Sequence, residues 1–540
     1  MVDVAEIVQR LDDLERRFAT AERERDQYKQ LYLETMERCR KLELGLRSSK
    51  SEHLPKDGAQ LSLDVLTMVL DDRQRAELEA ALAAAEAEGE QEVRGHVRRK
   101  PTGRKPIPEH LPRVEIVVLP PEVERAGLDA FDRIGEEISE VIERRPASLI
   151  VARIVRPKFV RKDRERDAQT QVLIGEPLAQ PIPKGLAGPG LLADTIVKRW
   201  QDHLPLHRLE DVYSRDGIEL ARSTMCGWHA ELAELCNPLI AAMRQDAFEQ
   251  PYLCVDATGV LVQHPEKCKT GHFWVVVAPE RHVLFEYTAE HTSDAVDDVL
   301  AGYSGYLVAD AHTVYDHLFD DGNLVEVNCW AHCRRYFFKA LASDPERAKV
   351  ALGLIAALFR IERTLANSPR KKREQIRGKR SRPIVDRFFS WCDAEALVVL
   401  DDTPISDGIR YSRNQRVGLT RFLEDGRLPI HNNWSELELR RQAVGRKNWL
   451  FVGHDDAGTV NATFTSLLAS ARLCDVEPWA YLRDILCLLP TWPEHRLLEL
   501  APVNWKTSAT PPTFEPASML IRSAALLLPQ KPRRRRDVVR

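Results

Sequence analysis

Residues 252–263 read YLCVDATGVLVQ, an apolar run rich in β-branched residues that predicts a buried strand ending in Asp256. Two more strand-like runs follow, GHFWVVVAPE and HVLFEYTAE, and the short link around 278–282 predicts that they form a hairpin. A helix (TSDAVDDVLAGY), a fourth strand ending in Asp310 and a fifth strand running into another helix complete the series. This order predicts a mixed sheet with helices on its faces.

The same order of elements is the ribonuclease-H-like order, so we predict an α/β protein with such a core. Its first part would span residues 249–344 and its second part residues 426–490. Between them, residues 345–425 hold amphipathic helical patterns around the basic run SPRKKREQIRGKRSRP and predict a helical insertion. Residues 491–540 end in QKPRRRRDVVR and predict a basic, disordered tail.

The chain before this core divides into segments of different composition. Residues 1–48 carry a heptad pattern, which fits either a coiled coil for self-association or one long amphipathic helix folded back on its own chain. Residues 49–115 predict a linker, whose basic Pro-rich part could lie along phosphates or act only as a solvated tether. Residues 116–180 alternate apolar and basic residues, which predicts a small β-rich module.

Residues 181–248 begin with the hinge PIPKGLAGPG and then show helical periodicity. The segment LEDVYS, a turn at 216–217 and a second helix capped by Ser223 resemble a helix-turn-helix. The second helix, over about 224–232, would then enter the major groove. For base reading it offers only Trp228, His229 and Glu231. A plain helical hairpin is slightly favoured as far as base reading is concerned.

The composition predicts a cytoplasmic protein with no membrane partner. Apolar residues make up 44% and charged residues 30% of the chain, and the formal net charge of -4 hides local basic patches. The 10 cysteines are scattered without any C-x-x-C, which argues for a reducing cytosol and against a four-cysteine zinc site. No apolar run approaches the ~20 residues of a membrane span, and the acidic amphipathic start is not a signal peptide.

Three carboxylates are candidates for a metal site: Asp256, Asp310 and Glu436. Ligands of open sheets bind outside the carboxyl ends of the strands, and adjacent strands lie only ~4.8 Å apart, so the two aspartates can share a site. Oxygen ligands suit Mg²⁺ or Mn²⁺, and two such ions would clamp the attacking and leaving oxygens of a phosphodiester. Aspartate is also a common turn residue, and Asp316 and Asp320 compete with Asp310.

The stretch HNNWSELELRRQAVGRKNWLF, residues 431–451, joins Glu436 to several cations. Asn432 and Asn433 are good N-cap residues, which would place Glu436 in the first turn of a helix. The cations that would hold the phosphate backbone are Arg440, Arg441, Arg446 and Lys447. An ordinary capped helix with solvated charges is the alternative for this stretch.

A collinear series of motifs runs from about Pro181 to Leu486. It consists of PIPKGLAGPGLLA, DHLPLHRLEDVYSRDGIELARST, VDATGV, KTGHFWVVV, VADAHTVYD, CWAHCRRYF, RSRPIVDRF, LTRFLEDGRLPIHNNWSELELRRQAVGRKNWLFVG and PWAYLRDIL. This series resembles the transposases of the insertion sequence 66 family, a subgroup of the DDE transposases. The resemblance implies a ribonuclease-H-like core with a helical insertion and assigns the DDE triad to the same three carboxylates.

The resemblance implies a metal-dependent transposase that cuts at the terminal inverted repeats of its element and joins the freed 3′ ends to a target. It further implies DNA of the element ends and of the target as partners. The carboxylate chemistry predicts two Mg²⁺ or Mn²⁺ ions, and the heptad segment predicts a homo-oligomer. Small accessory proteins of the same element are further candidate partners. Two alternatives are a nuclease or resolvase of the same fold, and a decayed DNA-binding relative without catalysis.

Some details agree with the family pattern and others depart from it. The segment from Cys329 to His332 resembles the C-x-x-H element of several DDE groups, although a buried strand end with a packed histidine is the alternative and one Cys and one His make no zinc site by themselves. Family members carry a Cys-rich zinc segment, whereas no cysteine lies between Cys39 and Cys226, so no zinc is expected. The usual acidic residue before the two asparagines is His431 here.

Overall fold

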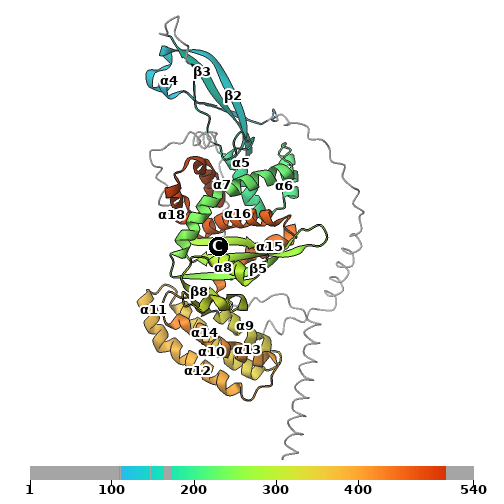
Figure 1. Ribbon diagram of the computed structural model, residues 1–540, viewed down its shortest axis with the longest axis vertical. Coiled ribbons are helices and arrows are strands. Elements are labelled where there is room, and N and C mark those ends of the chain that lie inside the picture. The colour runs from blue at the N-terminus through green and yellow to red at the C-terminus, as the bar shows by residue number, and fades with distance from the viewer. Residues whose placement is uncertain are drawn as a thin grey trace, which may run out of the picture. The chain divides into compact units, whose positions relative to one another are not determined.

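The computed structural model divides the chain into two compact units, Met1–Pro106 and Ile107–Arg540. The structure describes residues 107–505 of the second unit, apart from residues 108, 110, 146–147, 163–171 and 179. The heptad segment with its predicted coiled coil, most of the predicted linker and the basic end of the tail lie outside the described residues. Figure 1 shows the described elements in colour.

The largest sheet has five strands in the order β7-β6-β5-β8-β9. The strands are β5 (Tyr252–Val262), β6 (Lys269–Ala278), β7 (His282–Thr288), β8 (Gly305–Ala309) and β9 (Leu324–Asn328). Strands β5, β6 and β7 pair antiparallel, whereas β8 and β9 run parallel to β5, with helix α8 (Ser293–Leu300) between β7 and β8. The mixed sheet that the order of elements predicted is therefore present.

Strand β5 is longer than the sequence pattern indicated. The apolar run predicted an end at Asp256, whereas the strand continues to Val262. The antiparallel pairing with β6 also continues, as far as Val262 opposite Lys269, because Val260 and Val262 are buried against the core. Only the parallel pairing with β8 stops early, at Cys254 opposite Val308. Asp256 thus lies where the parallel pairing ends rather than where the strand ends.

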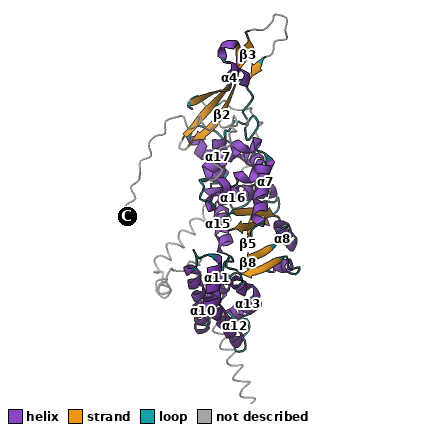
Figure 2. Ribbon diagram, turned by 90° about the vertical axis from the view of Figure 1, so that its left-hand side faces the viewer, coloured by secondary structure: helices purple, strands orange, loops and turns teal. Residues whose placement is uncertain are grey.

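Both faces of this sheet are covered, because successive side chains of a strand point to opposite faces. In β6, Trp274 and Val276 join an apolar cluster with helix α7 (Arg222–Phe248) and most of the buried apolar residues of α16 (Asp455–Leu473). Their neighbours Phe273 and Val275 join a second cluster with α9 (Trp330–Ala340) and α10 (Pro345–Thr364). Figure 2 shows the helices on either side of these strands, with α7 and α16 on one side and α10, α12 and α13 on the other.

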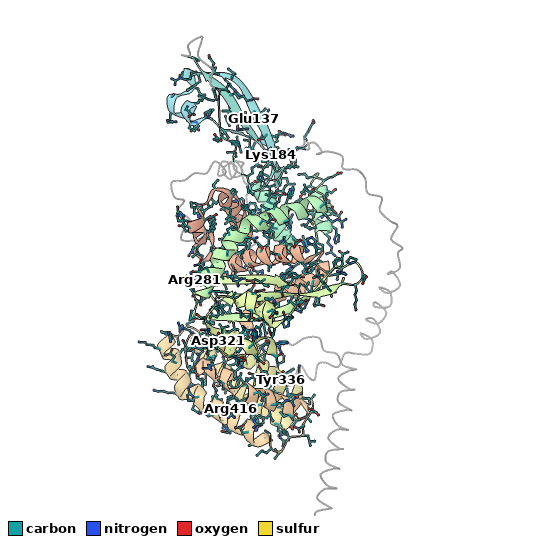
Figure 3. All side chains as sticks on the ribbon, in the orientation of Figure 1. Glu137, Lys184, Arg281, Asp321, Tyr336 and Arg416 are labelled. Atoms are coloured by element: carbon teal, nitrogen blue, oxygen red, sulfur yellow. The ribbon has the colours of Figure 1, made fainter. Side chains whose placement is uncertain are left out.

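The helices between β9 and residue 430 form the second of these layers. Besides α9 and α10, they are α11 (Arg370–Ile376), α12 (Arg382–Glu395), α13 (Pro404–Asn414) and α14 (Arg416–Thr420). Tyr336 of α9, labelled in Figure 3, stacks on Tyr411 of α13 with ring centroids 4.6 Å apart. Of these helices, α10 to α14 lie within residues 345–425, where the sequence predicted a helical insertion, whereas α9 precedes that range.

One residue of the basic run is buried inside this insertion. The Arg377 guanidinium is fully buried and bonds both carboxylate oxygens of Glu362, at 2.8 and 2.6 Å. It also donates to the backbone oxygens of Phe422, Asp425 and Leu428, at 2.6, 3.0 and 2.9 Å. A buried charge is tolerated when it is paired and fully hydrogen-bonded, and this arginine holds the segment that leads back to the sheet.

A smaller sheet occupies the region of the predicted β-rich module. Its strands are β1 (Arg113–Val117), β2 (Phe131–Arg145), β3 (Ser148–Arg161) and β4 (Leu173–Ile174), in the order β1-β3-β2 with β4 beside β3. The carboxylate of Glu143 in β2 accepts a hydrogen bond of 2.9 Å from the backbone N–H of Leu191. This bond attaches the small sheet to helix α5 (Pro189–Ile196).

The predicted helix-turn-helix needs a correction. Helix α6 (Leu206–Arg215) is followed by α7, which begins at Arg222 with Ala221 as its N-cap residue, so Ser223 lies inside the helix and does not cap it. Helix α7 continues to Phe248, well beyond residue 232. Trp228 and His229 are buried in the core while Glu231 is exposed, which favours the plain helical hairpin over base reading by this helix.

The predicted tail begins later than expected. Residues 491–505 belong to the packed core, because η7 (Glu494–Leu500) and α18 (Pro502–Trp505) bury Leu497 and Leu500. The Tyr481 hydroxyl of α17 (Pro478–Leu488) donates to the backbone oxygen of Leu500 at 2.9 Å. Among the described helices, none has the length and apolar character that a membrane span requires.

Candidate active site

Asp256 and Asp310 come from neighbouring parallel strands. In the pairing of β5 with β8, Tyr252 is opposite Tyr306 and Cys254 is opposite Val308. The same register, continued by two residues, brings Asp256 level with Asp310. The chain turns away directly afterwards, where Ala311 adopts a positive φ of 61°. Both aspartates line one cavity of about 240 Å³, so the structure brings these two predicted site residues together.

The surroundings of Asp256 disfavour its negative charge. Burial raises its pKa to about 7, and the charges of Asp310 and Glu436 add to the rise. The backbone N–H of Ala257, 2.8 Å from the carboxylate, and the more distant Arg335 act in the opposite direction. A bound cation would remove the repulsion between the carboxylates, and hard oxygen donors of this kind suit Mg²⁺ or Mn²⁺. The donor set therefore fits a divalent metal ion.

Glu436 reaches this region because helix α15 (Asn433–Trp449) is attached to β5. Asn432, which is fully buried, donates its side-chain N–H to the backbone oxygen of Val255 at 2.8 Å. The expected role of Asn432 was to cap the helix with its side-chain oxygen, but no such capping bond forms. The amide is instead oriented by its N–H bond to β5, and among the described residues its oxygen has no hydrogen-bond partner. Glu436 then lies in the first turn of α15, as the sequence predicted.

Two further contacts fix α15 along the strand. In its last turns, Arg446 donates to the Thr258 hydroxyl at 3.1 Å and to the backbone oxygen of Gly259. After the helix, the backbone N–H of Val452 donates to the oxygen of Leu261 at 2.8 Å. Helix and strand are thus connected near both ends, which leaves the position of Glu436 little freedom.

The carboxylate of Glu436 faces an imidazole, a guanidinium and a thiol. Its Oε1 atom is 3.4 Å from Nε2 of His332 and 3.6 Å from Nη2 of Arg335. No hydrogen bond to this buried oxygen is recorded within the described part of the chain. Cys329, His332 and Glu436 each offer a metal-binding atom, and these three atoms lie within 4.8 Å of one another. The C-x-x-H element therefore meets the third predicted carboxylate.

The four cations predicted to contact DNA do not act as one group. Arg446 is bound to β5, and Arg441 is half-buried and paired with Glu438. Arg440 and Lys447 are exposed, and within residues 107–505 no ion pair is recorded for either of them. Only the latter two have the exposure that phosphate contacts require.

Aromatic and imidazole rings that the sequence reasoning missed complete the cavity. His272, His291, His312 and Tyr315 line it together with the aspartates. The ring of His291 stacks on Trp274 with centroids 4.8 Å apart and meets His312 edge-on at 5.1 Å. The position of His312 two residues after Asp310 was a usable signal. The position of His272 opposite Gly259 in the β5–β6 pairing required the register.

Comparison with known families and proteins gives consistent matches. Residues 184–460 match the family described as Transposase IS66 family, residues 36–116 match the family described as Transposase C of IS166 homeodomain, and residues 466–503 match the IS66 C-terminal element. The chain is 28% identical over 496 residues to Uncharacterized protein y4hP of Sinorhizobium fredii, covering 87% of this chain and 88% of that protein. It is 30% identical over 454 residues to Uncharacterized protein y4qI of the same organism, covering 80% and 83%.

Proposed function

Because the chain belongs to the IS66 family of transposases, we propose that it cleaves DNA at the terminal inverted repeats of its insertion sequence and joins the freed 3′ ends to target DNA. One feature carries this proposal: Asp256 and Asp310 stand side by side in one cavity, with Glu436 close enough to raise the pKa of Asp256. Two aspartates where the parallel pairing of β5 and β8 ends, with a glutamate from a neighbouring helix, form the kind of site that phosphoryl transfer uses.

We propose that the sheet and its helices are a ribonuclease-H-like core. Three antiparallel strands followed by two strands parallel to the first support this assignment. The helical insertion lies between β9 and α15 in the chain. The insertion would therefore separate the two aspartates from Glu436 in the sequence, whereas the three residues lie close together in the folded core.

Asp256, Asp310 and Glu436 would hold the divalent ions, Mg²⁺ or Mn²⁺. Two such ions supply positive charge to the attacking and leaving oxygens of a phosphodiester. The protein's own residues would position the carboxylates. Asn432 fixes the start of α15 through its bond to Val255, and the partial burial of Asp256 weakens the screening of its charge by water.

DNA is the partner that membership of the family implies. On this chain we assign phosphate contacts to Arg440 and Lys447, which are exposed on α15. Self-association through residues 1–48 and assistance from small accessory proteins of the same element belong to the same proposal. The structure does not describe residues 1–48.

The test is incubation of the purified protein with labelled DNA that carries the ends of the element, together with target DNA and either Mg²⁺ or EDTA. We expect cleaved and joined products with Mg²⁺ only, and none from Asp256→Asn. The control is Asp316→Asn, since Asp316 is exposed and does not line the cavity. Cleavage without joining would indicate a nuclease or resolvase of the same fold. Cleavage that survives Asp256→Asn would exclude the assigned site.

A further inference from the structure

A second group of possible metal ligands, which includes a sulfur and a nitrogen atom as well as a carboxylate oxygen, lies near the two aspartates. The sulfur of Cys329, a ring nitrogen of His332 and a carboxylate oxygen of Glu436 lie within 4.8 Å of one another. Nε2 of His332 and Oε1 of Glu436 are 3.4 Å apart. Neighbouring ligands of a tetrahedral zinc ion with nitrogen and oxygen bonds of ~2.1 Å are about 3.4 Å apart. The spacing of this pair is therefore that of two ligands of one ion.

The three donors come from two helices, α9 and α15, that the core holds in place. Cys329 is the N-cap residue of α9 and is fully buried, and His332 follows one turn later. Glu436 comes from α15, on the far side of the insertion in the sequence. The side chains of His332 and Glu436 are 15% and 23% exposed, so the group is largely enclosed yet open on one side.

The sulfur atom is already surrounded by donors. The backbone N–H of Asn432 donates to Sγ of Cys329 at 3.1 Å. Burial raises the pKa of the Cys329 thiol to about 11, while the N–H groups of Asn432 and His332 lower it and the charge of Glu436 raises it again. Such N–H groups stabilise a metal-bound thiolate, as the outer partners of metal ligands generally do. A cation between sulfur and carboxylate would compensate both negative charges.

A simple ion pair accounts less well for the same geometry. Charge-assisted N–H···O bonds to carboxylates are about 2.7–2.9 Å long. His332 and Arg335 instead lie 3.4 and 3.6 Å from Oε1 of Glu436, which has no recorded hydrogen bond among the described residues although it is buried. A buried carboxylate oxygen in this state carries a desolvation cost. A bound metal ion would remove that cost.

We propose that Cys329, His332 and Glu436 bind one Zn²⁺ ion. Thiolate, imidazole and carboxylate together suit Zn²⁺ and not Mg²⁺, and three protein ligands leave a fourth position open. The sequence predicted no zinc because the Cys-rich segment of the family is missing and the C-x-x-H element alone offers only two ligands. The third ligand comes from a distant helix. The site shares Glu436 with the proposed catalytic triad, but zinc binding does not depend on DNA cleavage.

The experiment titrates the full-length protein with Zn²⁺ in competition with a chromogenic chelator. We expect one tight site per chain. Cys329→Ser and His332→Gln should each weaken it by at least about 100-fold, because loss of an outer partner alone costs up to that factor. Cys226→Ser removes an exposed thiol and should leave the affinity unchanged, which controls for adventitious binding to cysteine.

Replacement of Zn²⁺ by Co²⁺ gives a second readout that needs no cleavage assay. The wild-type protein should show a thiolate-to-cobalt charge-transfer band, and Cys329→Ser should lose it. If Cys329→Ser fails to fold, two measurements still test the zinc site: the zinc affinity of His332→Gln, and the charge-transfer band of the cobalt-loaded wild-type protein. Absence of a tight site in the wild-type protein, or affinity unchanged by both substitutions, would overturn the proposal. Asp256→Asn should keep zinc while losing cleavage, so failure of this site and failure of the proposed function are distinguishable.

Discussion

The side-chain amide of Asn432 donates to the backbone oxygen of Val255 at 2.8 Å, and Val255 directly precedes Asp256. Together with the bonds of Arg446 and Val452 to β5, this bond connects the helix that carries Glu436 to the strand that carries the first aspartate. The two bonded residues lie 177 positions apart in the sequence, on either side of the helical insertion. The relative placement of the proposed catalytic carboxylates therefore depends on a residue that would touch neither metal nor DNA.

Asn432→Ala should uncouple the helix from the strand. The substitution leaves the Val255 oxygen without its partner inside the core, which costs about 1–3 kcal/mol, and it should lower the cleavage rate more than the affinity for DNA. The control is Asn433→Ala, since Asn433 is the exposed neighbour. Chemical denaturation and single-turnover cleavage measure the two effects. An Asn432→Ala protein with unchanged stability and rate would exclude the positioning role.

Asp256 should make the metal-free protein less stable as the pH rises. Its folded-state pKa of about 7 lies above the ordinary value of 3.8, so the folded state binds this proton more tightly than the unfolded state does. Stability is then lost as the pH rises from about 4 to 7. Asp256→Asn should raise the unfolding temperature in EDTA at pH 8 but not at pH 4. Mg²⁺ should reduce the difference at pH 8.

Measurement of the same series with Asp316→Asn supplies the control, because Asp316 is exposed and outside the cavity. If Asp256→Asn gave the same small shift at every pH as Asp316→Asn does, Asp256 would not be subject to the burial and carboxylate repulsion that the structure indicates.

Arg377 should be needed for stability and not for contact with DNA. Its guanidinium is buried, pairs with Glu362 and bonds three backbone oxygens. Arg377→Met would leave the Glu362 carboxylate, which is 14% exposed, without its partner, and breaking a buried pair costs about 3–5 kcal/mol. The exposed Arg380 of the same run is the matched control. Urea denaturation should show a large loss for Arg377→Met and a negligible one for Arg380→Ala.

Arg440 and Lys447 should contribute to DNA affinity in a salt-dependent way. Each phosphate contact that is lost reduces the slope of log affinity against log salt concentration by about 0.9. Fluorescence anisotropy with end DNA at several salt concentrations measures this slope for Arg440→Ala and Lys447→Ala. If both variants gave the slope of the wild-type protein, neither residue would contact a phosphate of the DNA. Arg446→Ala should instead lower stability, since Arg446 is bound to Thr258 and Gly259.

The arrangement of the core could be predicted because each strand is a nearly continuous apolar run, as buried strands of a covered sheet are. The end of β5 could not be predicted, because its pairing with β6 continues past Asp256 while its pairing with β8 stops before it. The sequence of one strand does not show where pairing ends along each of its two edges. The role of Asn432 was missed for a similar reason. A local capping bond to the side-chain oxygen was the simpler expectation, but the N–H bond to a distant backbone oxygen orients the side chain toward β5, and no capping bond forms.

The site itself was predictable in part. Carboxylates after apolar runs pointed to Asp256 and Asp310, which line one cavity in the structure. The set of four cations on α15 could not be resolved into exposed and buried members, because that depends on which helix face meets β5. Likewise, Trp228 and His229 resembled exposed side chains of a recognition helix until the length and burial of α7 were known.

The central claim is that Asp256, Asp310 and Glu436 act together on DNA with divalent metal ions. The most direct measurement compares wild-type protein and Glu436→Gln in cleavage and joining of labelled element-end DNA, with Mg²⁺ and with EDTA. We predict joined products from the wild-type protein with Mg²⁺ only, and DNA binding without any product from Glu436→Gln. Cleavage by Glu436→Gln at the wild-type rate, or wild-type cleavage that persists in EDTA, would contradict the claim.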